Sequence, residues 1–252
     1  GMASLSVVGH TEVYRNPHPN LRSEYVAFPT VQALPDDTLL CMCRHGTARE
    51  SDDGRIVIHR STDAGETWEP TAELAGPSTS LEGLRLPGGF GVTSNGEALA
   101  VASLPDAGGG ICQYVARSSD GGLTWSELLP IDCNPFPHMG PGGNLVTLDD
   151  GTLVSGGEWG EQYDDGRQPQ WAAAITRSRD DGRTWEPWRC IQGSGGDNPL
   201  YYYDMRLTRL LDDLLDLSVL ESGQVHLNSR QARLDEAAAR QRERDAAKQR
   251  RA

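Results

Sequence analysis

The stretch "SRDDGRTW", residues 178–185, follows the pattern S-x-D-x-G-x-T-W. The chain carries this pattern twice more, as "STDAGETW" at residues 61–68 and "SSDGGLTW" at residues 118–125. The aspartates of the three copies lie 57 and 60 residues apart: Asp63, Asp120 and Asp180. A segment that recurs at such a period marks a repeated structural unit, because an active site would occur only once.

The residue types of the pattern are those of a tight turn. An ionised Asp can accept hydrogen bonds from successive backbone N–H groups. The Gly two residues later permits a positive φ that most side chains resist. The Trp offers enough apolar area to anchor the strand that follows. We therefore interpret "SRDDGRTW" as architecture, with no nucleophile and base paired within it.

A second signal recurs between the copies, in which a turn is followed by an apolar run. It reads "LPDDTLLCMC" at 34–43, "TSNGEALAVA" at 93–102, "TLDDGTLVSG" at 147–156 and "RLLDDLLDLSVL" at 209–220. Each turn also has a strand-like run before it and another after the apolar run. Four antiparallel strands per unit at this period are typical of β-propeller blades. The sequence predicts an all-β propeller with three intact blades and a fourth, incomplete one.

The end of the chain departs from the repeat. In the fourth unit Gln231 stands where the Asp would be, with no Gly or Thr-Trp behind it. Residues 230–252 are rich in Ala, Arg and Glu and lack Gly and Pro, which predicts a charged helix. Its near lack of an apolar stripe leaves three alternatives: an exposed or frayed helix, a partner-dependent segment, or disorder. We divide the chain into a propeller, 1–229, and this tail, 230–252.

Composition excludes several classes of partner. The net charge of −13 argues against nucleic acid and anionic membranes as ligands. No apolar run approaches the roughly 20 residues of a membrane helix. The first residues lack the basic and apolar regions of a secretory signal, so a cytoplasmic protein is expected, or a secreted one if a signal was removed. The five cysteines have no C-x-x-C spacing, and Cys41 and Cys43 are expected as small buried side chains on one strand face. No metal and no cofactor is predicted.

The S-x-D-x-G-x-T-W pattern resembles the Asp-box, or BNR repeat, of the sialidase (neuraminidase) superfamily, over about residues 22–230. The resemblance implies a sialidase-like β-propeller and a glycoside hydrolase that acts at the propeller mouth. Sialidases typically open their first blade with a Tyr-Arg-Ile-Pro-like strand whose Arg binds the substrate carboxylate. The matching segment here is "YVAFPTV", in which Ala27 replaces that Arg. A methyl group cannot replace a bidentate guanidinium.

Other family elements have counterparts in this chain. Arg44 fits a substrate-binding Arg after the second strand, and Asp52 or Asp53 fits the catalytic acid of the loop that follows. A loop carboxylate can act as a general acid if its pKa rises. The alternative is that "SDDG" at 51–54 is simply a polar turn before a strand.

Further candidates come from later blades. The run "YYYDMR" at 201–206 suggests Tyr203 as a catalytic residue, since sialidases use a Tyr nucleophile, with Asp204 and Arg206 binding substrate. Its alternative interpretation is a Tyr-rich strand, because Tyr favours β structure. Glu158 and His138 are further candidates for substrate binding at the same mouth.

Three functions follow from these patterns. The first is a sialidase-like glycoside hydrolase, the second a non-catalytic carbohydrate-binding propeller, and the third an inactive fragment that self-associates. Carbohydrate is the expected partner in the first two. Self-association would use the tail or open blade edges, because a ring of too few blades leaves strands unpaired.

Overall fold

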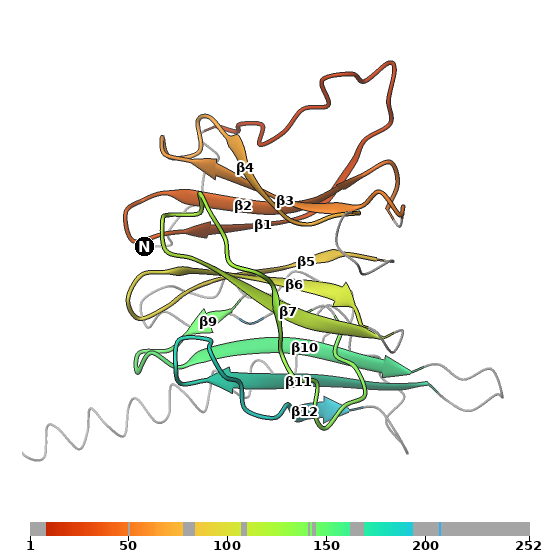
Figure 1. The fold of residues 1–252 in the computed structure, drawn as a ribbon, viewed down its shortest axis with the longest axis vertical. Coiled ribbons are helices and arrows are strands. Elements are labelled where there is room, and N and C mark those ends of the chain that lie inside the picture. Colours follow the sequence, from red (N-terminus) through yellow and green to blue (C-terminus); the bar gives the residue numbers. More distant parts are fainter. Residues whose placement is uncertain are drawn as a thin grey trace, which may run out of the picture. The chain divides into compact units, whose positions relative to one another are not determined.

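The chain forms three antiparallel sheets of four strands each in the part described by the computed structural model (Figure 1). The described residues are 9–49, 51–77, 84–106, 110–140, 142, 145–161, 169–193 and 207. Each sheet is built from four consecutive strands, and we refer to the sheets as blades 1, 2 and 3. No helix long and apolar enough to cross a membrane occurs among these residues.

Each blade runs in chain order from its first strand to its fourth, with neighbouring strands antiparallel. Blade 1 consists of β1 (Tyr25–Ala33), β2 (Leu39–Gly46), β3 (Arg55–Ser61) and β4 (Glu69–Ala75). Blade 2 consists of β5 (Leu86–Val92), β6 (Ala98–Pro105), β7 (Ile111–Ser118) and β8 (Leu129–Pro130). Blade 3 consists of β9 (Val146–Thr147), β10 (Leu153–Glu161), β11 (Gln170–Ser178) and β12 (Arg189–Gly193).

These strands confirm the three predicted four-stranded units. The fourth strand starts directly after Trp68 in blade 1, and four residues after Trp125 and Trp185 in blades 2 and 3. The predicted fourth unit and the tail at 230–252 lie outside the described residues.

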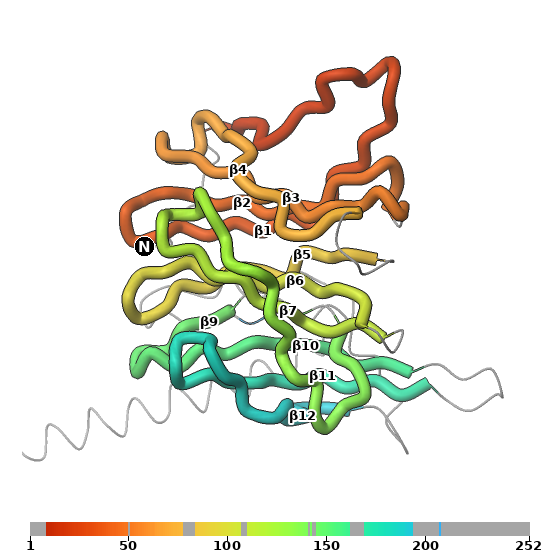
Figure 2. The backbone as a smooth tube through the Cα atoms, in the orientation of Figure 1, coloured from red at the N-terminus to blue at the C-terminus, as the bar shows by residue number. Residues whose placement is uncertain are grey.

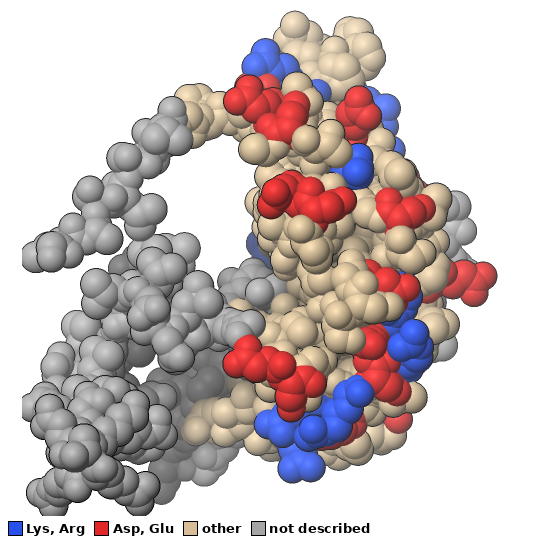
Figure 3. All heavy atoms as spheres, turned by 90° about the vertical axis from the view of Figure 1, so that its left-hand side faces the viewer, with Lys and Arg blue, Asp and Glu red and all other residues tan. Residues whose placement is uncertain are grey.

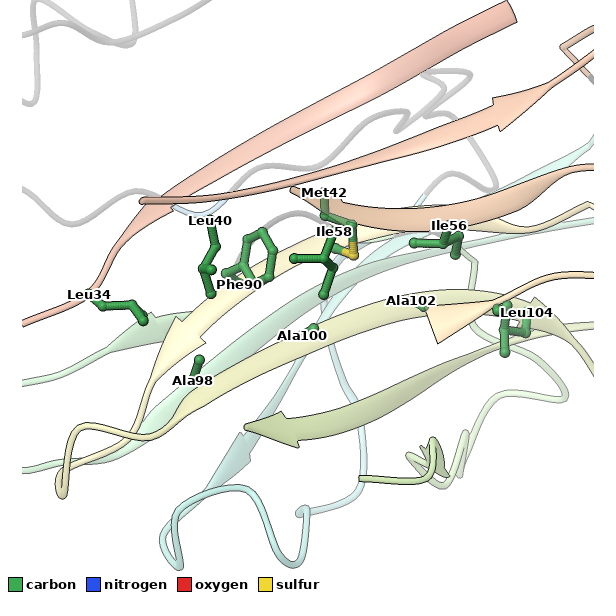
Figure 4. Packing of buried hydrophobic residues seen from close by; sticks show 11 residues of the cluster. Leu34, Leu40, Met42, Ile56, Ile58, Phe90, Ala98, Ala100, Ala102 and Leu104 are labelled. Carbon is green, nitrogen blue, oxygen red and sulfur yellow. The ribbon is translucent and has the colours of Figure 1, made fainter. Parts of the chain in front are cut away.

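The blades are successive layers, as the backbone trace shows (Figure 2). Alternation along a strand directs successive side chains to the two faces of each blade. Leu40 and Met42 of β2 pack with Phe90 of β5 and the even-numbered alanines of β6, such as Ala100 (Figure 4). The odd-numbered residues of β6, Leu99 and Val101, pack instead with Leu153 and Ala174 of blade 3. Blade 2 is therefore buried on both faces, since one face packs against blade 1 and the other against blade 3.

The turn in each S-x-D-x-G-x-T-W copy has the same hydrogen bonds. In the second copy, Asp120 Oδ1 accepts from the Thr124 backbone N–H at 2.9 Å and from Ser118 Oγ at 2.8 Å. Asp120 Oδ2 accepts from Thr124 Oγ1 at 2.5 Å. The bonds from Thr67 and Thr124 hold the pKa of Asp63 and Asp120 at about 2.

At Asp180 burial acts to raise the pKa, but the bonds from Thr184 and Ser178 still lower it to about 2. The three turns thus stay anionic well into the acid range.

Figure 3 views the molecule from the left-hand side of Figure 1, and acidic side chains are spread over that face.

The Gly of the pattern also lets neighbouring blades approach each other. Gly122 has φ of +88°, and a Cβ at this position would lie 2.4 Å from Cδ2 of Leu40 in blade 1. Gly182 has φ of +79°, and its Cβ would lie 2.8 Å from Cδ1 of Leu99 in blade 2. The glycine therefore serves two purposes. It adopts the positive φ of the turn, and its lack of a side chain lets the turn pack against a Leu of the preceding blade.

An arginine of the preceding blade binds each of these two turns. Arg60 of blade 1 donates from Nε to the Gly121 carbonyl of blade 2 at 2.9 Å. Arg117 of blade 2 likewise donates from Nη2 to the Asp181 carbonyl of blade 3. Both arginines directly precede the Ser of their own copy of the pattern. We call this Arg-to-turn hydrogen bond the blade latch.

Replacing Gly122 with Ala should destabilise the protein by about 2–4 kcal/mol, because the methyl group adds a clash with Leu40 to the cost of a positive φ. The matched control is Gly121→Ala, since Gly121 has φ of +73° but its Cβ would meet only Arg60 Nη2, at 3.7 Å. Urea unfolding followed by Trp fluorescence measures both variants. Equal losses of stability would mean that the contact with Leu40 contributes nothing.

Asp120→Asn should lower stability at neutral pH by removing charge-assisted acceptors. The folded-state pKa of Asp120 is about 2, below the ordinary value of 3.8, so its stabilisation is complete above pH 4 and disappears as pH falls through 2. The gap in urea midpoint between wild type and variant should therefore close between pH 4 and pH 2. Asp37→Asn, at an exposed turn residue with φ of 66°, is the control and should shift the midpoint little at any pH.

Candidate functional site

The loop between β2 and β3, residues 47–54, carries the candidate acids Asp52 and Asp53, and Arg44 lies beneath it. Arg44 has an exposed fraction of 0%. It donates from Nη1 to the Ala48 carbonyl at 2.7 Å and from Nη2 to the Ser51 carbonyl at 2.9 Å. A Cβ on Gly54 would lie 2.2 Å from Nη2 of Arg44, so only glycine leaves room for the guanidinium. The buried Arg44 side chain thus holds the loop in position through hydrogen bonds to its carbonyl groups.

A second buried arginine, Arg85, holds the same loop from blade 2. Arg85 directly precedes β5 and is 2% exposed. Its Nη1 donates to the carbonyls of Asp52 at 3.3 Å and Gly54 at 3.2 Å. Cations are seldom fully buried unless paired, and these two each bind carbonyls of one short loop. The loop is consequently fixed to both blades.

Asp53 is fastened within this loop. Its Oδ1 accepts from the Thr47 N–H and from Thr47 Oγ1, both at 3.1 Å. Hydrogen bonds from Ser51 and Thr47 lower the pKa of Asp53, and Arg44 adds to the effect. Asp53 is therefore ionised near neutral pH, which does not suit a proton donor. The cavity that it borders has a volume of about 90 Å³, well below the roughly 300–1,000 Å³ of small-molecule pockets.

Asp52 is exposed in a turn of the same loop. The loop also contacts β1 of blade 1, because Arg49 Cζ lies 5.9 Å from the ring centroid of Phe28 on that strand. Phe28 has φ of 56°, which is strained for a bulky residue, and it lies at a register shift between Ala27 and Thr30. The bulge presents the Phe28 ring at the surface, with 38% of the residue exposed. Arg49 and Phe28 therefore lie together at one rim of blade 1, and Asp52 belongs to the same loop as Arg49.

Ala27 pairs in register with Arg44 on the neighbouring strand. The Arg44 side chain extends to the loop carbonyls and is fully buried, so it does not supply a surface guanidinium at this point. Arg49, on the loop, is a cation that does lie at this rim.

His138, in the connection between β8 and β9, and Glu158, on β10 of blade 3, form a second group. His138 Nε2 lies 3.2 Å from the Gly160 carbonyl, and the Glu158 carbonyl accepts from the Gly140 N–H at 2.7 Å. Glu158 is buried, and His138 is partly exposed. Strands β6 and β10 end on the right of Figure 1, the side on which β2 leads into the Asp52 loop. The remaining candidates, Tyr203, Asp204 and Arg206, lie outside the described residues.

Sequence reasoning missed Arg85, Arg49 and the exposed Phe28. Arg85 lies in "LRLPGGF", where one basic residue before an apolar run has no distinctive spacing. Phe28 belongs to the quoted segment "YVAFPTV", but its positive φ has no signature, since bulky residues rarely adopt it.

No protein-family model matches the chain. Among solved structures, the Hadza microbial sialidase Hz136 matches with a TM-score of 0.54 and 22% identity, over 67% of this chain and 38% of that one. A levansucrase variant from B. megaterium matches with a TM-score of 0.51 and 11% identity, over 70% of this chain and 57% of that one. A Penicillium chrysogenum α-L-arabinanase complexed with arabinobiose has a TM-score of 0.46 and 19% identity, over 66% and 49% of the two chains.

The chain thus spans less than two thirds of the length of each of these proteins. At such identities the likeness concerns the fold. The fold is a sialidase-like β-propeller, as the sequence predicted.

Arg85→Met should lower the free energy of unfolding by about 2–3 kcal/mol, because it leaves buried carbonyls of the loop without their charged donor. Hydrogen exchange of the amides at residues 51–54 should accelerate at the same time. The control is Arg179→Met, which removes an exposed arginine paired with Glu186 and should change neither quantity appreciably. Unchanged exchange in Arg85→Met would show that Arg85 does not restrain the loop.

Proposed function

We propose that this propeller is a glycoside hydrolase of sialidase-like architecture and that the rim of blade 1 binds the glycan. The observation that supports this best is the Asp52 loop, which two buried arginines from different blades hold in one place. A catalytic carboxylate must keep its position while the substrate binds, so a site gains from such rigidity.

In this proposal Asp52 is the general acid. It is exposed in the free protein, and a bound glycan would cover it and exclude water. Desolvation of a carboxyl group raises its pKa, which favours the protonated form that donates to the leaving oxygen. Asp53 remains ionised beside it and fixes the loop through Thr47.

Two surface groups on the rim suit a sugar. The exposed Phe28 ring offers an apolar face for the C–H side of a pyranose. Arg49, above that ring, carries the positive charge that a sugar carboxylate would need in the absence of an Arg at position 27. We further propose that the mouth is completed by His138 before blade 3, by Glu158 on β10, and by Tyr203, Asp204 and Arg206.

The second candidate is a propeller that binds carbohydrate without cleaving it. Ala27 and the lowered pKa of Asp53 favour this function, because both remove groups that a sialidase-like reaction would use. Binding needs only the rim surface, whereas turnover also needs a proton donor.

A panel of 4-methylumbelliferyl glycosides, with a glycan array in parallel, tests both functions. We expect turnover by the wild type and a fall in kcat of about 10²- to 10⁴-fold in Asp52→Asn, the usual contribution of a general acid. Asp53→Asn should instead reduce thermal stability, with less than about a 10-fold change in kcat.

Asp37→Asn, at the β1–β2 turn, is the matched control and should retain wild-type turnover. Binding to the array without turnover of the glycosides would reject the hydrolase proposal and support the carbohydrate-binding function. The absence of both would reject both and leave self-association, measured as a concentration-dependent mass, as the remaining hypothesis.

A further inference from the structure

Three side chains that commonly bind transition metals meet on the face of blade 1 that points away from blade 2. Cys43 and His45 are two residues apart on β2, so they share this face, and His59 on β3 pairs in register with Cys41. Cys43 Sγ lies 3.3 Å from His45 Nε2 and 3.8 Å from His59 Nδ1. The three ligand atoms all lie within 4.8 Å of one another.

These distances match the spacing of ligands around one ion. With metal bonds of about 2.3 Å to sulfur and 2.0–2.1 Å to nitrogen, a tetrahedral ion separates S and N ligands by about 3.5 Å. The two separations in this cluster fall on either side of that value. The Cys43 sulfur is therefore at coordination spacing from a nitrogen of each histidine, and the ligand atoms of the two histidines lie within 4.8 Å of each other.

The cluster is buried and has unused bonding capacity. Cys43, His45 and His59 are each 2% exposed or less. Each imidazole in its neutral form offers one ring-nitrogen lone pair to a metal ion. His59 Nε2, the ring nitrogen other than the Nδ1 measured from Cys43, is buried without a hydrogen-bond partner, which is unusual for a polar atom in a folded protein.

Residues around the cluster provide an outer shell of the kind found at metal sites. Glu24 Oε1 lies 3.8 Å from His45 Nδ1, the ring nitrogen on the side away from Cys43. Glu24 in turn accepts a 2.5 Å hydrogen bond from the Tyr14 hydroxyl. The Tyr14 ring packs on His45 with a centroid distance of 4.6 Å. A carboxylate beside the second nitrogen of a ligating histidine fixes its orientation and raises its basicity.

A pocket of about 400 Å³ opens beside the cluster and is lined by both histidines and by Tyr14. Three protein ligands leave a tetrahedral ion one free position. The pocket offers water, or a small anionic or thiol ligand, a route to that position.

We propose that Cys43, His45 and His59 bind one Zn²⁺ ion, with Glu24 and Tyr14 as supporting residues and the fourth position open to the pocket. A thiolate with two imidazoles suits Zn²⁺ better than Mg²⁺ or Ca²⁺, which prefer oxygen ligands. Binding deprotonates Cys43, so one thiol proton is released to solvent as the Zn–S bond forms. The site is separate from the Asp52 loop, and neither proposal depends on the other.

The expectation of no metal rested on the missing C-x-x-C spacing. Ligands that come from two paired strands create no such spacing, since Cys43 and His59 are 16 residues apart in sequence. Only the strand register brings them together.

Titration of the chelator-treated full chain with Co²⁺ and then Zn²⁺ tests the site. We expect a thiolate-to-cobalt charge-transfer absorption that saturates at one ion per chain and disappears when Zn²⁺ displaces the cobalt. Cys43→Ser should abolish the absorption. Cys41→Ser is the matched control, because Cys41 is buried on the same face but does not belong to the cluster, and this variant should retain the absorption.

A second readout guards against misfolded variants. Zn²⁺ should raise the melting temperature of the wild type and of Cys41→Ser, and should not raise that of His59→Gln or Cys43→Ser, whose circular dichroism must match the wild type. No charge-transfer absorption in the wild type, or an unchanged absorption in a folded Cys43→Ser, would overturn the proposal.

Discussion

The blade latch is the interaction on which the arrangement of the sheets depends. Arg60 and Arg117 reach from one blade into the turn of the next, and the turn can come close enough only because it contains a glycine. Apolar burial supplies most of the attraction between blades, but it is not directional. The latch adds a charged hydrogen bond with fixed geometry, so it sets how each layer is seated on the one before.

The candidate site inherits its geometry from this stacking. Arg85 stands at the start of β5 in blade 2, yet it holds the Asp52 loop of blade 1, so the two layers must be in register for the loop to take its shape. A disturbance in the packing of blades 1 and 2 should therefore reach the rim even though the rim residues are untouched. Such coupling gives the two buried guanidinium groups a structural role at positions where apolar side chains would pack with less desolvation.

The fold was predictable from the sequence to the level of individual strands, because turn residues at fixed offsets mark each unit. Asp63, Asp120 and Asp180 identify their turns without reference to tertiary structure, since their partners lie within four residues. The site was less predictable. Asp52 and Asp53 look alike in "SDDG", and only the contacts with Thr47 and Ser51 separate an ionised structural carboxylate from an exposed one.

The latch has a direction, because the arginine always comes from the earlier blade and the acceptor from the later one. Arg177 holds the equivalent place before the third copy of the pattern. Blade 2 thus supplies an acceptor to blade 1 and a donor to blade 3. A unit that carries both groups can be duplicated or deleted without leaving its neighbours unmatched, which gives this architecture a simple route to changing its number of repeats.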